Sequence, residues 1–347
     1  MKKFSLLLTL LLAVSMLAGC AGTPVVYECN CPTNGVVDTA TPDVLPEGAV
    51  KTGLAIVGGA EGKTAEEISY DVTIVGVTVD DAGVIRSCII DSLGAKVAID
   101  ATGAVTSDVT AAPATKNELG ENYGMVAYGG AKYEWFEQAA ALAEFAVGKT
   151  VEELKNGAVD ESGKAPAGTD LASTATIYLG GYVSAIEAAV ANAQALGAAS
   201  GDELRLAVTN SLGSSKSATA EEAGLAQLDC DVTVLTVNGD TITSCYIDSL
   251  QAKVNFDQTG AVTSDLTAPM QTKNQLGENY GMVAWGGAIA EWNAQAASFA
   301  AYVTGKTAAE VAGIAVNERT APTEADLASS VTIAIGGFQA LIAKAMQ

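Results

Sequence analysis

The chain contains one segment twice. Residues 115–125 read TKNELGENYGM, and residues 272–282 read TKNQLGENYGM with a single change. The similarity continues upstream, where IDSLGAKV (90–97) returns as IDSLQAKV (247–254). Each copy spans roughly 150 residues, the size of one domain with its own core. A solenoid is excluded because its repeats span about 20–50 residues. The duplication therefore predicts two tandem domains of one fold.

The start of the chain indicates secretion. Lys2 and Lys3 precede an apolar stretch that ends at Leu17-Ala18-Gly19-Cys20, a small-residue cleavage site, and the stretch is too short to span a bilayer. The ending resembles the bacterial lipoprotein box, which implies a lipid on the Cys20 thiol. Each buried methylene contributes about 0.8 kcal/mol to membrane binding. We expect a cell-surface protein, anchored through Cys20 to the outer face of the cytoplasmic membrane of a bacterium. The alternative is a secreted protein with a chance cysteine.

Composition narrows the function further. The formal net charge is −22 at pH 7, and nucleic acid is not an expected partner because no basic patch could neutralise phosphates. The chain has no histidine, which excludes Ser-His-Asp catalysis and histidine-ligated zinc or haem. The cysteines besides Cys20 are odd in number, which argues against a disulfide framework. Cys29 and Cys31 could oxidise or bind metal, but we expect free thiols and no metal site.

Hydrophobic patterning predicts an α+β fold. Alternating, β-branched residues predict strands at 70–79, 84–90 and 95–100. Apolar residues at helical spacing predict a helix at 134–148, and an alanine-rich helix follows at 182–196. Strands followed by helices describe an antiparallel sheet with helices packed on one side, formed once in each tandem copy.

The expected organisation follows from these boundaries. We expect a lipoprotein signal peptide and lipobox (1–20), a flexible tether (21–48), repeat 1 (49–196), a linker (197–204) and repeat 2 (205–347).

The last loop of each copy carries the most informative motif. DLASTAT (170–176) and its counterpart DLASSVT (326–332) resemble the Asp-x-x-Ser/Thr-Gly-Ala-Thr motif of the bacterial FMN-binding domain. The strand–turn–strand before the motif and the alanine-rich helix after it are also similar to that family. In the family a flavin transferase attaches FMN through a phosphoester to the final threonine. The resemblance implies these cofactor-binding residues: Asp170, Ser173, Thr176, Asp326, Ser329 and Thr332.

The family resemblance also implies a function. Its members include tandem-domain surface lipoproteins that serve in extracellular electron transfer. By this resemblance the chain is a flavoprotein electron carrier, a lipoprotein with FMN on one or both domains, served by a flavin transferase and by membrane electron donors. It would be an electron-transfer protein or binding module rather than an enzyme with its own substrate. The alternative is a non-catalytic surface binding or structural lipoprotein that keeps the fold and binds no flavin.

Other repeated features allow two interpretations. The aromatic residues that both copies share, Tyr123, Trp135, Tyr280 and Trp292, could flank a flavin ring, or the tryptophans could anchor their helix to the sheet. The loop at 115–125 is expected to lie against the sheet, with turns at its glycines and asparagine bonds to backbone, or to bind a ligand.

Two further features of the sequence are candidate sites, one for flavin and one for hydrolysis. Residues 102–107 and 259–264 contain a Thr-Gly-Ala core, which predicts a hairpin turn rather than a second flavin site. Asp100 and Asp108 are the pair of carboxylates that a hydrolase would use.

Overall fold

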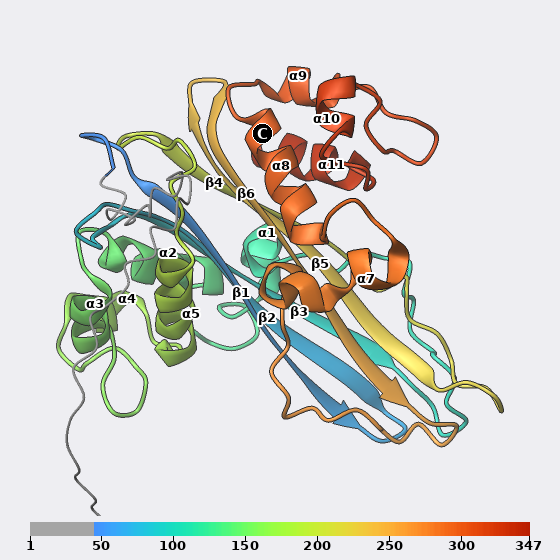
Figure 1. Ribbon diagram of the computed structural model, residues 1–347. Helices are drawn as coiled ribbons and strands as arrows, with labels where there is room; N and C mark the ends of the chain where they lie inside the picture. The colour runs from blue at the N-terminus through green and yellow to red at the C-terminus, as the bar shows by residue number, and fades with distance from the viewer. Residues whose placement is uncertain (1–44) are drawn as a thin grey trace, which may run out of the picture. The chain divides into compact units, whose positions relative to one another are not determined.

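The computed structural model describes residues 45–347, which form one compact unit (Figure 1). The signal peptide, Cys20 and most of the expected tether lie outside the described residues. The unit contains two separate three-stranded antiparallel sheets, ordered β1-β2-β3 and β4-β5-β6, together with helices. The strands are β1 (Lys51–Lys63), β2 (Glu67–Val79), β3 (Ile85–Ala98), β4 (Glu203–Ser211), β5 (Gly224–Asn238) and β6 (Thr241–Phe256).

Each sheet is a meander whose turns follow from local chemistry. Asp80 closes the β2–β3 turn, because its Oδ1 accepts the backbone N–H groups of Ala82 and Val84, both at 2.9 Å. Gly83 completes this turn at φ 76°. In the second repeat the connection is shorter, and Gly239 supplies the left-handed conformation at φ 60°.

One strand prediction was wrong in its boundaries. The segments expected at 84–90 and 95–100 are parts of one strand, β3, which pairs without interruption along β2 from Ser87 to Ala98. Asp91 and Ser92 lie in the middle of it. Their polarity suggested a break, but both are buried, and the carboxylate of Asp91 binds the backbone of the loop that follows.

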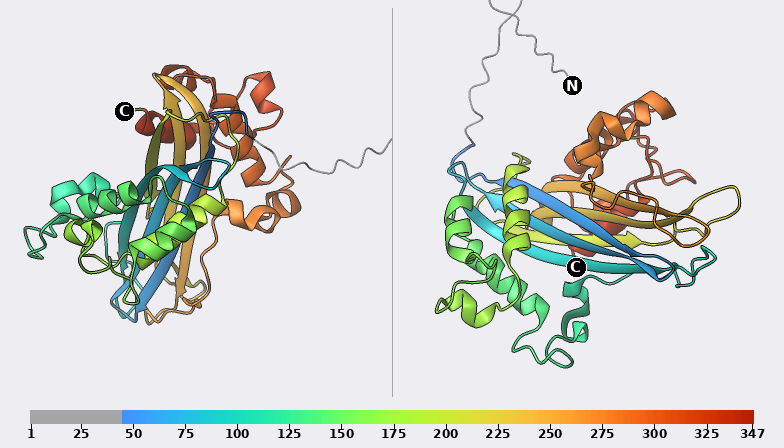
Figure 2. Two further views of the ribbon diagram at one scale, coloured as in Figure 1. Left: turned by 90° about the vertical axis from the view of Figure 1, so that its left-hand side faces the viewer. Right: turned by 90° about the horizontal axis from the view of Figure 1, so that it is seen from below.

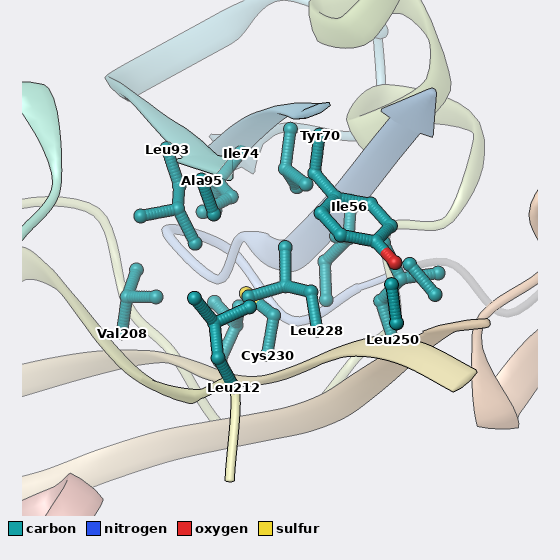
Figure 3. Close-up of a cluster of buried hydrophobic side chains, with 14 of the residues drawn as sticks. Ile56, Tyr70, Ile74, Leu93, Ala95, Val208, Leu212, Leu228, Cys230 and Leu250 are labelled. Atoms are coloured by element: carbon teal, nitrogen blue, oxygen red, sulfur yellow. The ribbon is translucent and has the colours of Figure 1, made fainter. Parts of the chain in front are cut away.

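The two repeats share a hydrophobic core. One face of each sheet contributes to a single cluster of buried side chains, part of which is drawn in Figure 3. Leu93 and Ala95 belong to the first sheet, and Leu228 and Cys230 to the second. Glycine allows close approach here, since a Cβ on Gly76 would lie 2.7 Å from Val234 Cγ2.

Two further clusters each belong to one repeat. In repeat 1, the opposite face of β2 and β3 contributes to a cluster with α2 (Trp135–Ala146), α3 (Val151–Ala158) and α5 (Gly180–Ala191). The corresponding cluster of repeat 2 includes α8 (Trp292–Val303), α9 (Ala308–Ala312) and α11 (Gly336–Ala345). Figure 2 shows the green helices beside the blue strands and the orange and red helices beside the yellow strands.

The last helix of repeat 1 is shorter than expected. The pattern predicted a helix to residue 196, but α5 ends at Ala191. Asn192 then donates through Nδ2 to the carbonyl of Leu54, and Gln194 pairs with Thr52 of β1. These bonds end the helix and hold the following segment against β1. Among residues 45–347, no helix is both long enough and apolar enough to cross a bilayer.

The repeated loop is a capped, folded segment. It contains α1 (Lys116–Leu119) and a 3₁₀ turn η1 (Gly120–Tyr123). Asn117 anchors it to β3, because its Nδ2 donates to the carbonyl of Ile90 at 2.9 Å. Gly120 and Gly124 have φ of 52° and 79°, so the predicted glycine turns are confirmed. Repeat 2 contains the equivalents α6 (Lys273–Leu276) and η2 (Gly277–Tyr280), followed by α7 (Met282–Gly286).

Candidate functional site

The motif threonines are exposed in both repeats. In repeat 1 the short helix α4 (Asp170–Thr174) ends just before Thr176, and α5 begins four residues after it. In repeat 2, α10 (Ala325–Ala328) and α11 place Thr332 in the same way. Thr169 caps α4 by accepting the N–H of Ala172 at 3.2 Å. The motif loop is therefore a short helix, a connecting segment of five residues in repeat 1 and seven in repeat 2, and a second helix.

The side chain of a buried glutamine forms hydrogen bonds with each motif threonine. Gln138 of α2 is fully buried, and its Oε1 accepts the N–H of Thr176 at 2.8 Å, the Thr176 hydroxyl at 3.2 Å and the N–H of Ile177 at 3.2 Å. Gln295 of α8 makes the same three bonds around Thr332, at the same distances. The amide nitrogen of Gln138 in turn donates to a backbone carbonyl at 2.9 Å. Gln138 thus makes four hydrogen bonds at the point where the motif enters the core.

The other motif residues have local roles. Ser173 and Ser329 are exposed, and their hydroxyls donate to the carbonyls of Asp170 and Asp326 at 2.7 and 2.8 Å. Both aspartates are exposed in the first turn of their short helices, where a carboxylate is favourable to the helix dipole. Within residues 45–347, no hydrogen bond joins these aspartate or serine side chains to the Thr176 or Thr332 hydroxyl. The structure brings the threonines to the glutamines and not to the other motif side chains.

A shallow cavity lies at the residues that follow the motif in repeat 1, and Thr176 itself does not line it. It has a volume of about 450 Å³ and is lined by Tyr178, Gly180 and Gly181 together with Lys155 and Asp160. Tyr178 is 60% exposed, and its ring covers Gly180, where a Cβ would lie 2.7 Å from the tyrosine hydroxyl. The equivalent of Tyr178 in repeat 2 is Ala334. Only the first repeat therefore has an aromatic ring at this place among the described residues.

The shared tryptophans are buried and contact the last helix of their repeat, whereas one of the two interpretations expected them to anchor their helix to the sheet. Trp135 is 2% exposed, and its Nε1 donates to the Tyr182 hydroxyl of α5 at 2.9 Å. Trp292 packs edge-on against Phe338 of α11. Lys116 lies over the Trp135 ring at 5.1 Å from its centroid, an arrangement that favours a cation–π contact. These tryptophans are not available to flank a ligand ring.

The alternative sites of the sequence are turns. Asp100 Oδ1 accepts the N–H and hydroxyl of Thr102 at 2.8 and 2.6 Å, so the predicted hairpin turn at 102–107 is confirmed. Asp108 closes a separate turn by accepting the Thr110 hydroxyl at 2.6 Å. These threonine bonds hold the pKa of each carboxyl below its usual value. Each carboxylate therefore closes its own turn.

Two thiols of the described residues, Cys230 and Cys245, are buried. Cys245 is buried beside an apolar cavity of about 540 Å³ between β6 and α8, and burial raises its pKa to about 12. Burial also raises the pKa of Cys230. A thiol that stays protonated is a poor nucleophile and metal ligand. In the part of the chain that the structure describes, no group of three or more Cys, Asp or Glu side chains is placed to hold a metal ion.

Sequence reasoning missed three features of these surfaces. The clamping glutamines, Gln138 and Gln295, stand at matching positions of the two copies, which was the available signal. Tyr128 and Trp285 also match, and each is 92% exposed just after the repeated loop, Tyr128 on a turn and Trp285 in α7. The third feature is the row of β-sheet residues around Asp71, which is described below.

No family model, no curated protein and no solved structure matches this chain. The assignment of a function therefore depends on the motif and on the geometry of its threonines.

Proposed function

We propose that this chain is a membrane-anchored extracellular lipoprotein that carries electrons on FMN attached to one or both repeats. The observation that supports the proposal best is the equivalent, exposed presentation of Thr176 and Thr332. An attached flavin would supply one- or two-electron redox chemistry, and the protein would position it. We also propose that each repeat is an antiparallel sheet with its helices packed on one side.

The hydrogen bonds around Thr176 are compatible with modification. Ester formation joins Oγ1 to the phosphorus of an activated FMN donor, expels the donor's leaving group and releases the hydroxyl proton. The Oγ1 bond to Gln138 would be lost, and it is the hydroxyl contact at 3.2 Å. The two backbone N–H bonds to the same Oε1 do not involve the hydroxyl and would remain. The motif loop could therefore keep its conformation after modification.

The first repeat fits a flavin better than the second. The cavity lined by Tyr178, two residues after Thr176, has a volume of about 450 Å³, within the range of small-molecule sites. Tyr178, which follows Thr176 by two residues, has an exposed aromatic ring. Ala334 offers no such face in repeat 2. We propose Thr176 as the preferred attachment site and Thr332 as the secondary one.

Attachment suits a protein on the cell surface. A dissociated cofactor would diffuse away, whereas a covalent link keeps it at an effective concentration on the order of millimolar. The partners would be the membrane, through lipidated Cys20, a flavin transferase and membrane electron donors. The high negative charge would keep the domains away from anionic headgroups.

The second candidate is a surface binding or structural lipoprotein without flavin. One observation favours it: both threonine hydroxyls already donate to a buried glutamine, so each has a structural role of its own. In this case the exposed rings of Tyr128 and Trp285 would be the functional features.

Co-expression with a flavin transferase separates the two candidates. The electron carrier predicts yellow protein whose mass rises by one or two esterified FMN groups. Thr176→Ala should remove the first group, and Thr332→Ala should remove any second one. Thr174→Ala is the matched control, because its hydroxyl bonds only to carbonyls of its own helix, and it should keep the modification. Colourless protein of unchanged mass in the presence of an active transferase would reject the carrier and favour the binding module.

A further inference from the structure

A row of three residues crosses the first sheet with almost no side chains. Gly59 of β1 pairs with Asp71 of β2, and Asp71 pairs with Gly94 of β3. A Cβ built on either glycine would meet no atom within 4 Å, so the space above both is open. Asp71 therefore has a glycine, which carries no side chain, beside it on each neighbouring strand. Its one hydrogen bond to a described side chain is a long contact of 3.5 Å from the Ser92 hydroxyl.

Residues of the repeated loop line one side of the space above this row. Lys116, Leu119 and Tyr123 line a cavity of about 560 Å³ above Gly59, Asp71 and Gly94, which we call the Asp71 cavity. The Tyr123 ring is 39% exposed, and the Lys116 ammonium lies 5.3 Å from its centroid. The cavity therefore has a flat floor, the carboxylates of Asp71 and Glu61, the ammonium of Lys116 and an aromatic wall.

Repeat 2 has the same frame, but the space is filled. Its row is Ser211, Asp229 and Gln251, so that Gln251 stands where repeat 1 has Gly94. The Gln251 amide donates through Nε2 to Asp229 at 3.0 Å, and its Oε1 accepts the Tyr280 hydroxyl at 3.2 Å. The carboxamide thus bridges the aspartate of the sheet and the tyrosine of the loop.

Asp229 is fully engaged, in contrast to Asp71. Besides Gln251, it accepts Gln227 Nε2 at 2.6 Å and the Ser214 hydroxyl at 2.9 Å. The tyrosines of the two loops have the same pose, since Lys273 lies 5.4 Å from the Tyr280 centroid. Repeat 1 therefore retains the two ends of the bridge, Asp71 and Tyr123, and lacks the carboxamide between them.

The missing group defines the chemistry of a ligand. A ligand in this place must donate an N–H to the Asp71 carboxylate, and its neighbouring oxygen must accept a hydrogen bond from the Tyr123 hydroxyl. A carboxamide can do both, whereas an ionised carboxylate has no N–H to donate. The bond to Asp71 would be charge-assisted and stronger than a neutral one. The glycine floor and the Tyr123 ring suit a planar group, and the volume exceeds that of one side chain.

We propose that the Asp71 cavity binds a small molecule with a planar ring and a carboxamide, whose N–H donates to Asp71 and whose oxygen accepts the Tyr123 hydroxyl. The site is independent of the motif threonines and of flavin attachment.

Nicotinamide is the probe, and nicotinate is its matched control. Isothermal titration of the purified full-length protein should show nicotinamide bound at one site per chain. Nicotinate should bind at least about tenfold more weakly, because it lacks the N–H donor and its negative charge meets two carboxylates, Asp71 and Glu61, against the single ammonium of Lys116. Asp71→Asn should weaken nicotinamide binding about tenfold by removing the charge of the acceptor.

Substitutions at Gly94 locate the site. Gly94→Gln copies repeat 2 and should abolish binding, with thermal unfolding unchanged or at a higher temperature. Gly94→Ala is the control, since a methyl group cannot reach Asp71, and it should keep binding within about threefold. Absence of nicotinamide binding at millimolar concentration would overturn the proposal. Equal binding of nicotinate, or full binding by folded Gly94→Gln protein, would overturn it as well.

Discussion

Gln138 accepts the backbone N–H of Thr176 at 2.8 Å, from a position in α2 with no solvent exposure. The same bond joins Gln295 to Thr332 at the same distance in the second repeat. A helix that precedes the motif in sequence thus fixes the conformation of the motif loop. Thr176 is exposed as a residue, while its backbone N–H and its hydroxyl both bond to the buried glutamine.

Removing this clamp should cost stability. Gln138→Ala leaves the N–H groups of Thr176 and Ile177 without an acceptor and opens a cavity, so the free energy of unfolding should fall by about 2–4 kcal/mol. Urea denaturation followed by circular dichroism measures it. Glu152→Ala, at an exposed position on α3, is the control and should change the value by less than about 0.5 kcal/mol. Equal stability of the two variants would show that the clamp contributes little.

Glu134 should hold the turn that presents Tyr128. It is 5% exposed, and its carboxylate accepts the N–H groups of Met125 and Val126 at 2.8 and 2.9 Å. Glu134→Ala should leave these amides unprotected, and their hydrogen exchange should accelerate by about tenfold or more while that of β2 stays slow. Glu144→Ala, at an exposed position of the same helix, serves as control. Unchanged exchange in Glu134→Ala would mean that the glycine turns alone fix the segment.

The buried carboxyl of Asp248 should make stability depend on pH. Burial raises its pKa from 3.8 to about 6, although the Thr272 hydroxyl and backbone N–H groups bind the carboxylate. Between about pH 4 and 6 the folded state therefore binds more protons than the unfolded state, and this carboxyl reduces stability as the pH rises. Asn is neutral and keeps the accepting oxygen. From pH 4 to 7, Asp248→Asn should gain roughly 2–3 kcal/mol relative to the unmodified protein.

The control variant should change stability with pH in the opposite direction. Asp257 is exposed in a turn, where the Thr259 hydroxyl and N–H lower its pKa. Asp257→Asn should therefore lose stability relative to the unmodified protein as the pH rises through the acid range. Denaturation series at several pH values measure both variants. A flat difference for Asp248→Asn would show that this carboxyl titrates normally in the fold.

Thr320 should be a point of backbone strain. It has φ 57° in a turn where Asn317 accepts the N–H groups of Arg319 and Ala321. The equivalent turn of repeat 1 has Gly163 at φ 73°. Thr320→Gly should raise the free energy of unfolding by about 1 kcal/mol, because the left-handed conformation opposes a β-branched residue.

The reverse exchange tests the same idea. Gly163→Thr should destabilise by more than 1 kcal/mol, about the cost of the conformation alone, since a Cβ would also lie 2.2 Å from the Tyr178 ring. Thermal unfolding of both variants gives the comparison. Destabilisation by Thr320→Gly would show that contacts of the threonine side chain outweigh the strain.

The sequence by itself determined the duplication, the two antiparallel sheets, the approximate positions of the predicted strands and helices of repeat 1, and the turn at Thr102. These features are local, because they depend on period-two alternation, helical spacing and residues that adopt positive φ. The polar pair Asp91-Ser92 misled the prediction of β3 because a buried carboxylate with backbone partners looks like a break in a strand. The end of α5 was missed because tertiary pairing of Gln194 with Thr52 ended the helix.

Only the tertiary structure decided what covers each face and what each polar group binds. Alternation shows that Leu93 and Leu228 are buried, but not that they meet in one core between the repeats. The change from Gly94 to Gln251 is visible in the sequence, yet its consequence depends on Asp71 and Tyr123, which are distant along the chain. Cross-strand and loop-to-sheet contacts join residues of large sequence separation, so no local pattern encodes them.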